Sequence, residues 1–141
     1  MPTTRARTAN RLLWAAQILV AALFLFAGSM KFIMSAAQMQ QGPIVFPMSF
    51  LYFIGACECL GALGLILPAI TRIRTGLVPL AAAGLTIIMI GATTVTVIGM
   101  GVVAAIFPAI VGLITAWIAY GRTRIAPLTS ASAPRRMLRT A

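Results

Sequence analysis

The sequence has no histidine and only one acidic residue, Glu58, among its 141 residues. Charged residues make up 9% of the chain and apolar residues 61%, whereas soluble domains carry about 25% and about 45–50%. So few charges cannot cover a water-exposed surface, and the surface must therefore face lipid. This composition excludes an ordinary cytosolic enzyme and a disordered basic protein. Two cysteines are too few for a disulfide-rich secreted domain.

Positive charge is abundant by contrast, with eleven Lys and Arg residues and a net charge of +10. Such an excess raises the question of nucleic-acid binding. Here the basic residues lie almost entirely at the chain ends and in one short loop between apolar blocks. That distribution is typical of topology signals and of contacts with anionic lipid headgroups. We therefore expect membrane lipid, and no nucleic acid, as a partner.

Four apolar runs follow one another, at about 12–33, 48–70, 77–98 and 102–120. Each has about 19–23 residues, which as a helix at 1.5 Å per residue spans a hydrocarbon core of about 30 Å. In lipid the backbone must satisfy its own hydrogen bonds, so such runs are helices. The sequence predicts an all-α, four-transmembrane-helix bundle over 12–124. A basic segment, 1–11, precedes it and a flexible basic tail, 125–141, follows it.

The basic residues also predict the orientation, because cytoplasmic segments carry more Lys and Arg. With four spans, three segments share one side of the membrane, and these hold Arg5, Arg7, Arg11, Arg72, Arg74, Arg122 and Arg124. Both termini are therefore expected in the cytoplasm. A cleaved signal peptide over residues 1–27 is the alternative. It is disfavoured because the first apolar stretch continues through Ile33.

Glu58 lies near the middle of the second span, where an ionisable group costs several kcal/mol unless it is paired or faces water. Lys31 is the one basic residue away from the cytoplasmic side, in the outer half of the first span. Counted from the loop that joins the two spans, Lys31 and Glu58 lie about 12 and about 15 Å deep. Antiparallel neighbouring helices would thus bring them together as an ion pair. If the first span ended at Ile33, Lys31 would reach outward and Glu58 would stay alone.

Two interpretations of this pair stay open at this point. It is either a structural link that fixes the register of the first two spans, or part of a site that handles a ligand or protons. Cys57 and Cys59 flank Glu58, but residues two apart on a helix point about 200° apart, so they cannot form a disulfide with each other. A metal site would need histidine or more cysteine, so we expect none.

Small and polar residues in the spans suggest further contacts. Gly61 and Gly64 in the second span, and Gly84 with Gly91 in the third, are spaced for close helix packing. Thr86 and Thr93 repeat at the same interval and are candidates for lining a polar cleft. Gln17, a polar group in the inner half of the first span, is a third candidate.

Two stretches resemble the DoxX-like family: residues 24–32, FLFAGSMKF, and residues 54–68, IGACECLGALGLILP. Residues 79–85 and 119–122 agree with the family in order and spacing, so the resemblance covers about residues 12–124. It implies a compact four-helix bundle in a bacterial cytoplasmic membrane. The family's lysine in span one and glutamate in span two correspond to Lys31 and Glu58.

The name-giving members of the wider family are associated with thiosulfate:quinone oxidoreductase, and others with membrane redox or thiol-stress complexes. The resemblance therefore implies an accessory, non-catalytic subunit of a quinone-linked system. We expect no cofactor held by the chain itself and no catalysis by it alone, with a quinone as a bound ligand. Redox partner proteins and a second copy of the chain are candidate partners. The alternatives are a small proton-coupled cation transporter that uses Glu58 and a purely structural scaffold.

Overall fold

The computed structural model describes residues 4–131, and within this range it contains helices and no strands. The long helices are α1 (Thr4–Ile33), α3 (Met48–Thr71), α4 (Leu77–Met100) and α5 (Val102–Tyr120). A short helix, α2 (Ala36–Met39), lies in the loop after α1, and a π-helical turn, η1 (Gly121–Ile125), continues α5. Four helices in the described part of the chain are long and apolar enough to cross a membrane. The predicted all-α, four-span architecture is confirmed.

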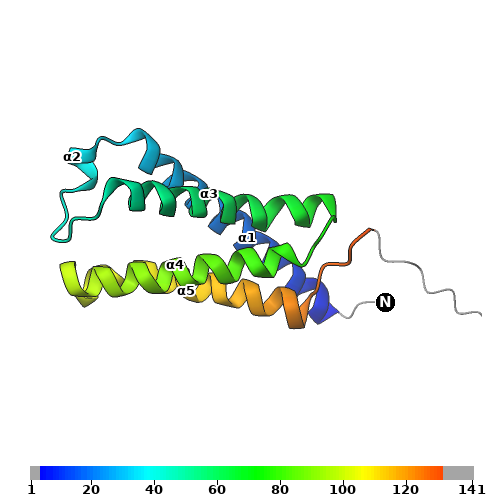
Figure 1. Cartoon of the computed structure of the whole chain (residues 1–141). Helices are drawn as coiled ribbons and strands as arrows, with labels where there is room; N and C mark the ends of the chain where they lie inside the picture. The colour runs from blue at the N-terminus through cyan, green and yellow to red at the C-terminus, as the bar shows by residue number, and fades with distance from the viewer. Residues whose placement is uncertain (1–3, 132–141) are drawn as a thin grey trace, which may run out of the picture.

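The long helices pack in the order α1, α3, α4, α5, each mainly against its neighbour in the chain, with α1 meeting α5 less extensively. Figure 1 shows α2, the loop that follows it and the α4–α5 turn at one end of the bundle, which we call the α2 end. The start of α1, the α3–α4 turn and η1 lie at the opposite end, the η1 end. The three segments rich in arginine therefore share one end of the molecule, as four spans require.

The first helix is longer than the apolar run that predicts it, because it already begins at Thr4. With 30 residues it extends over about 45 Å, more than the thickness of a hydrocarbon core. Arg5, Arg7 and Arg11 therefore stand on helical turns that precede the apolar part of α1. The segment over 1–11 is thus helical from residue 4 onward.

The core of the bundle contains few large side chains, and most large apolar residues point outward. Fully buried apolar residues include Val20, Phe24, Leu65, Leu85 and Ile118. Outward-facing ones occur along every long helix, among them Leu19, Leu60, Ile87 and Leu113. An exterior this apolar suits lipid rather than water as the surrounding solvent.

Residues 126–131 return across the turn between α3 and α4. The hydroxyl of Thr75 lies 2.9 Å from the carbonyl oxygen of Leu128, to which it donates, and 3.0 Å from the hydroxyl of Ser130. The amide of Ala131 donates to the carbonyl oxygen of Arg72 at 3.0 Å. This part of the predicted flexible tail is therefore bound to the bundle by hydrogen bonds, and residues 132–141 of that tail lie outside the described range.

Candidate functional site

Lys31 and Glu58 form an ion pair between α1 and α3. The ammonium nitrogen of Lys31, in the last turn of α1, donates to Oε2 of Glu58 at 2.6 Å. The same nitrogen lies 3.4 Å from the carbonyl oxygen of Ala27. The Glu58 side chain is only 5% exposed, against 24% for Lys31. The ion pair is therefore present although α1 ends at Ile33, the boundary for which we expected Lys31 to reach outward and Glu58 to stay alone. The similar depths from which the pair was predicted do not hold, because Lys31 lies at the end of α1 and Glu58 lies well inside α3.

Two glycines explain how the charged groups come so close. A β-carbon on Gly28 would stand 2.7 Å from the carbonyl oxygen of Gly55, and one on Gly55 would stand 3.0 Å from the carbonyl oxygen of Gly28. Only glycine allows α1 and α3 to cross at this distance. Lys31 and Glu58 each lie three residues beyond one of these glycines, on the same helix face. Because α1 and α3 run antiparallel, these two steps lead in opposite directions. Lys31 lies level with Gly55, and its side chain reaches back along α1, to within 3.4 Å of the Ala27 carbonyl oxygen, to meet Glu58.

The ion pair forms part of the wall of a pocket of about 490 Å³ between α3 and α4. The remaining wall is largely apolar and contains three phenylalanines, Phe46, Phe50 and Phe53, together with Cys57 and Gly91. Phe53 is 62% exposed, and nothing lies within 4 Å of a β-carbon built on Gly91. The pocket therefore opens on the outer surface of the bundle, where lipid would lie. We call it the aromatic pocket.

None of the other predicted lining residues belongs to the wall of the aromatic pocket. The hydroxyl of Thr86 donates to that of Thr115 at 2.9 Å, which links α4 to α5. The hydroxyl of Thr93 donates to the carbonyl oxygen of Met89 in its own helix at 2.7 Å. Gln17 lies in a different polar cluster, described below. The structure thus brings together Lys31 and Glu58 only.

Glycine spacing predicts helix packing correctly in α3 but not in α4. A β-carbon on Gly61 would stand 2.6 Å from a Leu85 side-chain carbon, and one on Gly64 would stand 2.9 Å from the β-carbon of Ala81. Gly84 and Gly91 have no neighbour within 4 Å of such an atom. The packing role expected for these two glycines is therefore wrong, because both lie on the lipid-facing side of α4.

Cys57 and Cys59 are both free thiols, and they lie in different surroundings. Cys57 lines the aromatic pocket, whereas the sulfur of Cys59 lies 2.7 Å from where a β-carbon on Gly28 would stand. Their separation around the helix is the one expected from helical geometry. Within residues 4–131, no three His, Cys, Asp or Glu side chains gather as metal ligands would.

A second polar cluster lies at the η1 end and surrounds Arg122. This residue is 3% exposed, and its Nε donates to Oε1 of Gln17 at 2.5 Å. Its Nη1 donates to Oδ1 of Asn10 at 2.7 Å and to the carbonyl oxygen of Ala126 at 3.3 Å. The guanidinium carbon also lies 5.5 Å from the centre of a Trp14 ring, a cation–π geometry. The cluster thus joins α1 to the segment after α5.

The sequence does not predict this cluster, because Arg122 has the position and composition of a topology signal. The polar Gln17 within an apolar run was the available hint, since such a group needs a partner. Its amide nitrogen donates to the carbonyl oxygen of Leu65 at 2.8 Å, so Gln17 connects α1 to both α3 and Arg122.

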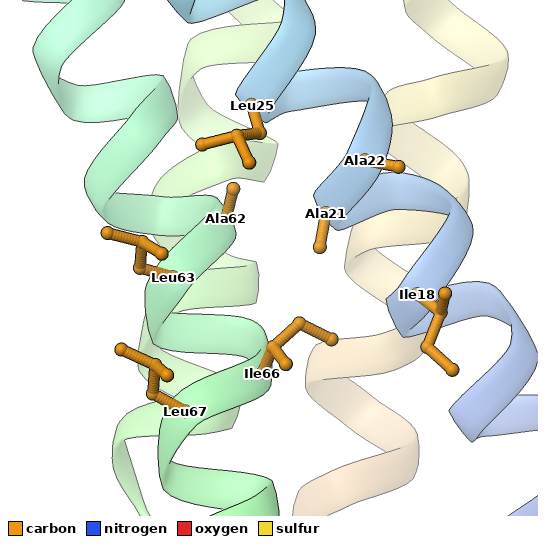
Figure 2. Close-up of a pocket in the computed structure, with 8 residues that line it drawn as sticks. All are labelled: Ile18, Ala21, Ala22, Leu25, Ala62, Leu63, Ile66 and Leu67. Carbon is orange, nitrogen blue, oxygen red and sulfur yellow. The ribbon is translucent and has the colours of Figure 1, made fainter.

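A further hollow of about 260 Å³ lies between α1 and α3. Figure 2 shows its eight labelled lining residues, all of which are apolar: Ile18, Ala21, Ala22, Leu25, Ala62, Leu63, Ile66 and Leu67. It offers no side chain that would orient a polar ligand. The aromatic pocket, with its charged wall, is therefore the candidate site.

Comparison with known proteins agrees with this architecture. No curated protein and no solved structure matches the chain. The family model of DoxX-like proteins matches residues 15–118, a range that contains the α1–α3 crossing, the ion pair and the aromatic pocket. The chain is therefore a membrane protein that belongs to the DoxX-like family.

Proposed function

We propose that the protein binds the headgroup of a lipid-soluble quinone in the aromatic pocket, as an accessory, non-catalytic subunit of a redox system in the bacterial cytoplasmic membrane. One observation carries this proposal. The Lys31–Glu58 ion pair forms a polar wall in a pocket that is otherwise lined by aromatic and aliphatic side chains. Pockets for small organic ligands combine an apolar lining with a few placed polar groups in this way.

The chemistry of Lys31 fits a quinone carbonyl. An ammonium group has three N–H donors, and the structure uses two of them, toward Glu58 and Ala27. The third donor is available to an oxygen of a ligand in the pocket. Glu58 holds the ammonium in place, so it acts as a positioning residue for this donor.

The phenylalanines of the aromatic pocket would bind the ring of the quinone. Phe46, Phe50 and Phe53 come from the loop before α3 and from its first turns. Flat aromatic rings stack favourably on one another, and a quinone ring has the same shape. The opening of the pocket toward lipid gives an isoprenoid-tailed molecule a route from the bilayer.

The accessory role is supported by the side chains that the pocket holds. Cys57 is the one thiol in its wall, and Cys59 packs against α1 instead. A bound quinone would therefore exchange electrons with a partner protein. The ion pair argues against the cation exporter, because a carboxylate bound to an ammonium is not free to exchange protons for a substrate.

The test measures binding of decylubiquinone, a short-tailed quinone, to the detergent-purified protein by equilibrium dialysis. We expect saturable binding to the wild type and at least tenfold weaker binding to Glu58→Gln and to Lys31→Met. Gly91→Leu fills the pocket without touching the ion pair and should abolish binding. Gly84→Leu is the matched control, since Gly84 is equally unobstructed on the same helix but lies outside the pocket.

Absence of saturable binding to the wild type would overturn the proposal, and so would equal binding by the two glycine variants. A structural link without a ligand is the second candidate, and the crossing at Gly28 and Gly55 beside the ion pair favours it. That candidate predicts no quinone binding but a strong dependence of stability on the pair.

A further inference from the structure

The η1 end of the bundle contains a pocket with a basic wall, which is separate from the aromatic pocket. It has a volume of about 330 Å³, and its lining includes Arg7 and Asn10 from α1, Arg72 from the α3–α4 turn, and Ala126. We call it the basic pocket. This volume falls within the range of about 300–1,000 Å³ that small-molecule sites occupy.

Arg122 lies directly behind this wall. Its Nη1 donates to Asn10 and to Ala126, both of which line the basic pocket. The guanidinium group therefore contacts two residues of the pocket wall directly. Oδ1 of Asn10 accepts from Arg122, and the NH2 group of the same carboxamide has no hydrogen-bond partner within residues 4–131, so it can donate to a ligand.

The charge of Arg122 has no acidic counterpart among residues 4–131. Glu58 is the only acidic side chain in the sequence, and it binds Lys31. Arg122 is held by neutral oxygens instead, and its Nη2 is buried with no hydrogen-bond partner within residues 4–131. Buried charges in proteins are ordinarily paired, so this end of the bundle lacks an anion.

We infer that the basic pocket binds a phosphate-bearing anion. Arg7 and Arg72 would contact the phosphate oxygens, since guanidinium groups match phosphate geometry with paired N–H donors. Asn10 would donate a further hydrogen bond, and the charge of Arg122 would strengthen binding from behind the wall. Three positive charges and one amide thus converge where the sequence places the membrane interface.

Two sources supply this chemistry, the headgroup of an anionic phospholipid and free phosphate. Lipid binding is measured by native mass spectrometry of the detergent-purified full chain, titrated with phosphatidylglycerol or with phosphatidylcholine. Binding of inorganic phosphate is measured by equilibrium dialysis. Saturable binding of phosphatidylglycerol in preference to phosphatidylcholine supports a lipid site, and saturable binding of phosphate alone supports a site for the free anion.

A pair of double variants separates the pocket from diffuse surface charge. Arg7→Gln with Arg72→Gln removes the arginines of the basic pocket, and we expect binding to weaken at least tenfold. Arg5→Gln with Arg74→Gln removes the same charge from α1 and from the same turn, but neither residue lines the pocket. This control should weaken binding less than threefold. All four side chains are exposed, so the fold is expected to tolerate these changes.

Equal losses in the two double variants would overturn the inference, because binding would then follow total charge rather than the pocket. Failure of the wild type to bind either anion saturably would overturn it as well. Neither result bears on the aromatic pocket, which lies at a different place between α3 and α4.

Discussion

The carbonyl oxygen of Gly55 lies 2.7 Å from the position that a β-carbon on Gly28 would occupy. At this crossing α1 and α3 meet almost backbone to backbone, and the Lys31 side chain spans the crossing to reach Glu58. The contact therefore determines the position of the charged wall of the aromatic pocket. Its loss would move Lys31 away from Glu58.

Replacing Gly28 by alanine should destabilise the bundle. The added methyl group would collide with the backbone of α3, and overpacking of this kind costs about 1–3 kcal/mol. Thermal unfolding in detergent, followed by circular dichroism, should show a lower midpoint. Gly84→Ala is the control, because its methyl group meets open space and alanine favours a helix by up to about 1 kcal/mol. Equal destabilisation by both changes would contradict the close crossing.

Reversing both charges of the ion pair should restore what either single reversal destroys. Lys31→Glu or Glu58→Lys places two like charges together, and breaking a buried pair costs about 3–5 kcal/mol. The double variant has a complementary pair again. Size-exclusion chromatography after detergent extraction should show a monodisperse peak for the wild type and the double variant, and aggregation for the single variants. A double variant that aggregates as much as the single ones would refute the energetic importance of the pair.

Lysine should not replace Arg122. The guanidinium binds Gln17 and Asn10 through different nitrogens and lies over Trp14, and a lysine ammonium lacks this planar geometry. We expect Arg122→Lys to lower the free energy of unfolding by about 2 kcal/mol, as for other broken buried networks. Arg124→Lys is the matched control on the same turn, where the side chain is exposed. The midpoint of thermal unfolding should fall only for Arg122→Lys, and an unchanged midpoint would show that Arg122 adds no stability.

The orientation expected from the arginines can be tested by cysteine labelling. In a Cys57→Ala, Cys59→Ala background, Ala37→Cys places a thiol on α2 and Thr129→Cys places one at the η1 end. Both positions are exposed. A membrane-impermeant maleimide added to intact spheroplasts should label residue 37 only, because the η1 end carries the positive charges that stay in the cytoplasm. Labelling of residue 129 and not of residue 37 would show that the chain has the opposite orientation.

The sequence predicts the four helices and the pairing of Lys31 with Glu58, because both follow from one-dimensional quantities. The lengths of apolar runs give the spans, and the occurrence of one acid and one base in the adjacent first and second spans gives the pair. The depth estimate behind the pair does not hold, because α1 already ends at Ile33. The sequence does not predict which helix face points inward, because apolar residues lie on both sides of a helix in lipid. For that reason the glycine pattern is informative at Gly61 but misleading at Gly84 and Gly91.

The role of Arg122 escapes sequence reasoning for a similar reason. An arginine just beyond the last span has the composition of a topology signal, and nothing local distinguishes it from the exposed Arg124. Its burial depends on η1, where Gly121 lets Leu13 approach closely, and on Asn10, which lies beyond the apolar part of α1. Contacts between such distant positions require the packed bundle.

The bond between Gln17 and Arg122 also imposes an order on biosynthesis. Gln17 emerges from the ribosome early, but its partner follows 105 residues later, after the other three long helices have been made. The ion pair of Lys31 and Glu58 spans only 27 residues and can close while the nascent chain is still half complete. The pair of helices α1 and α3 can thus assemble before the rest of the chain is made. The contacts at the η1 end form only after α5 has entered the bilayer.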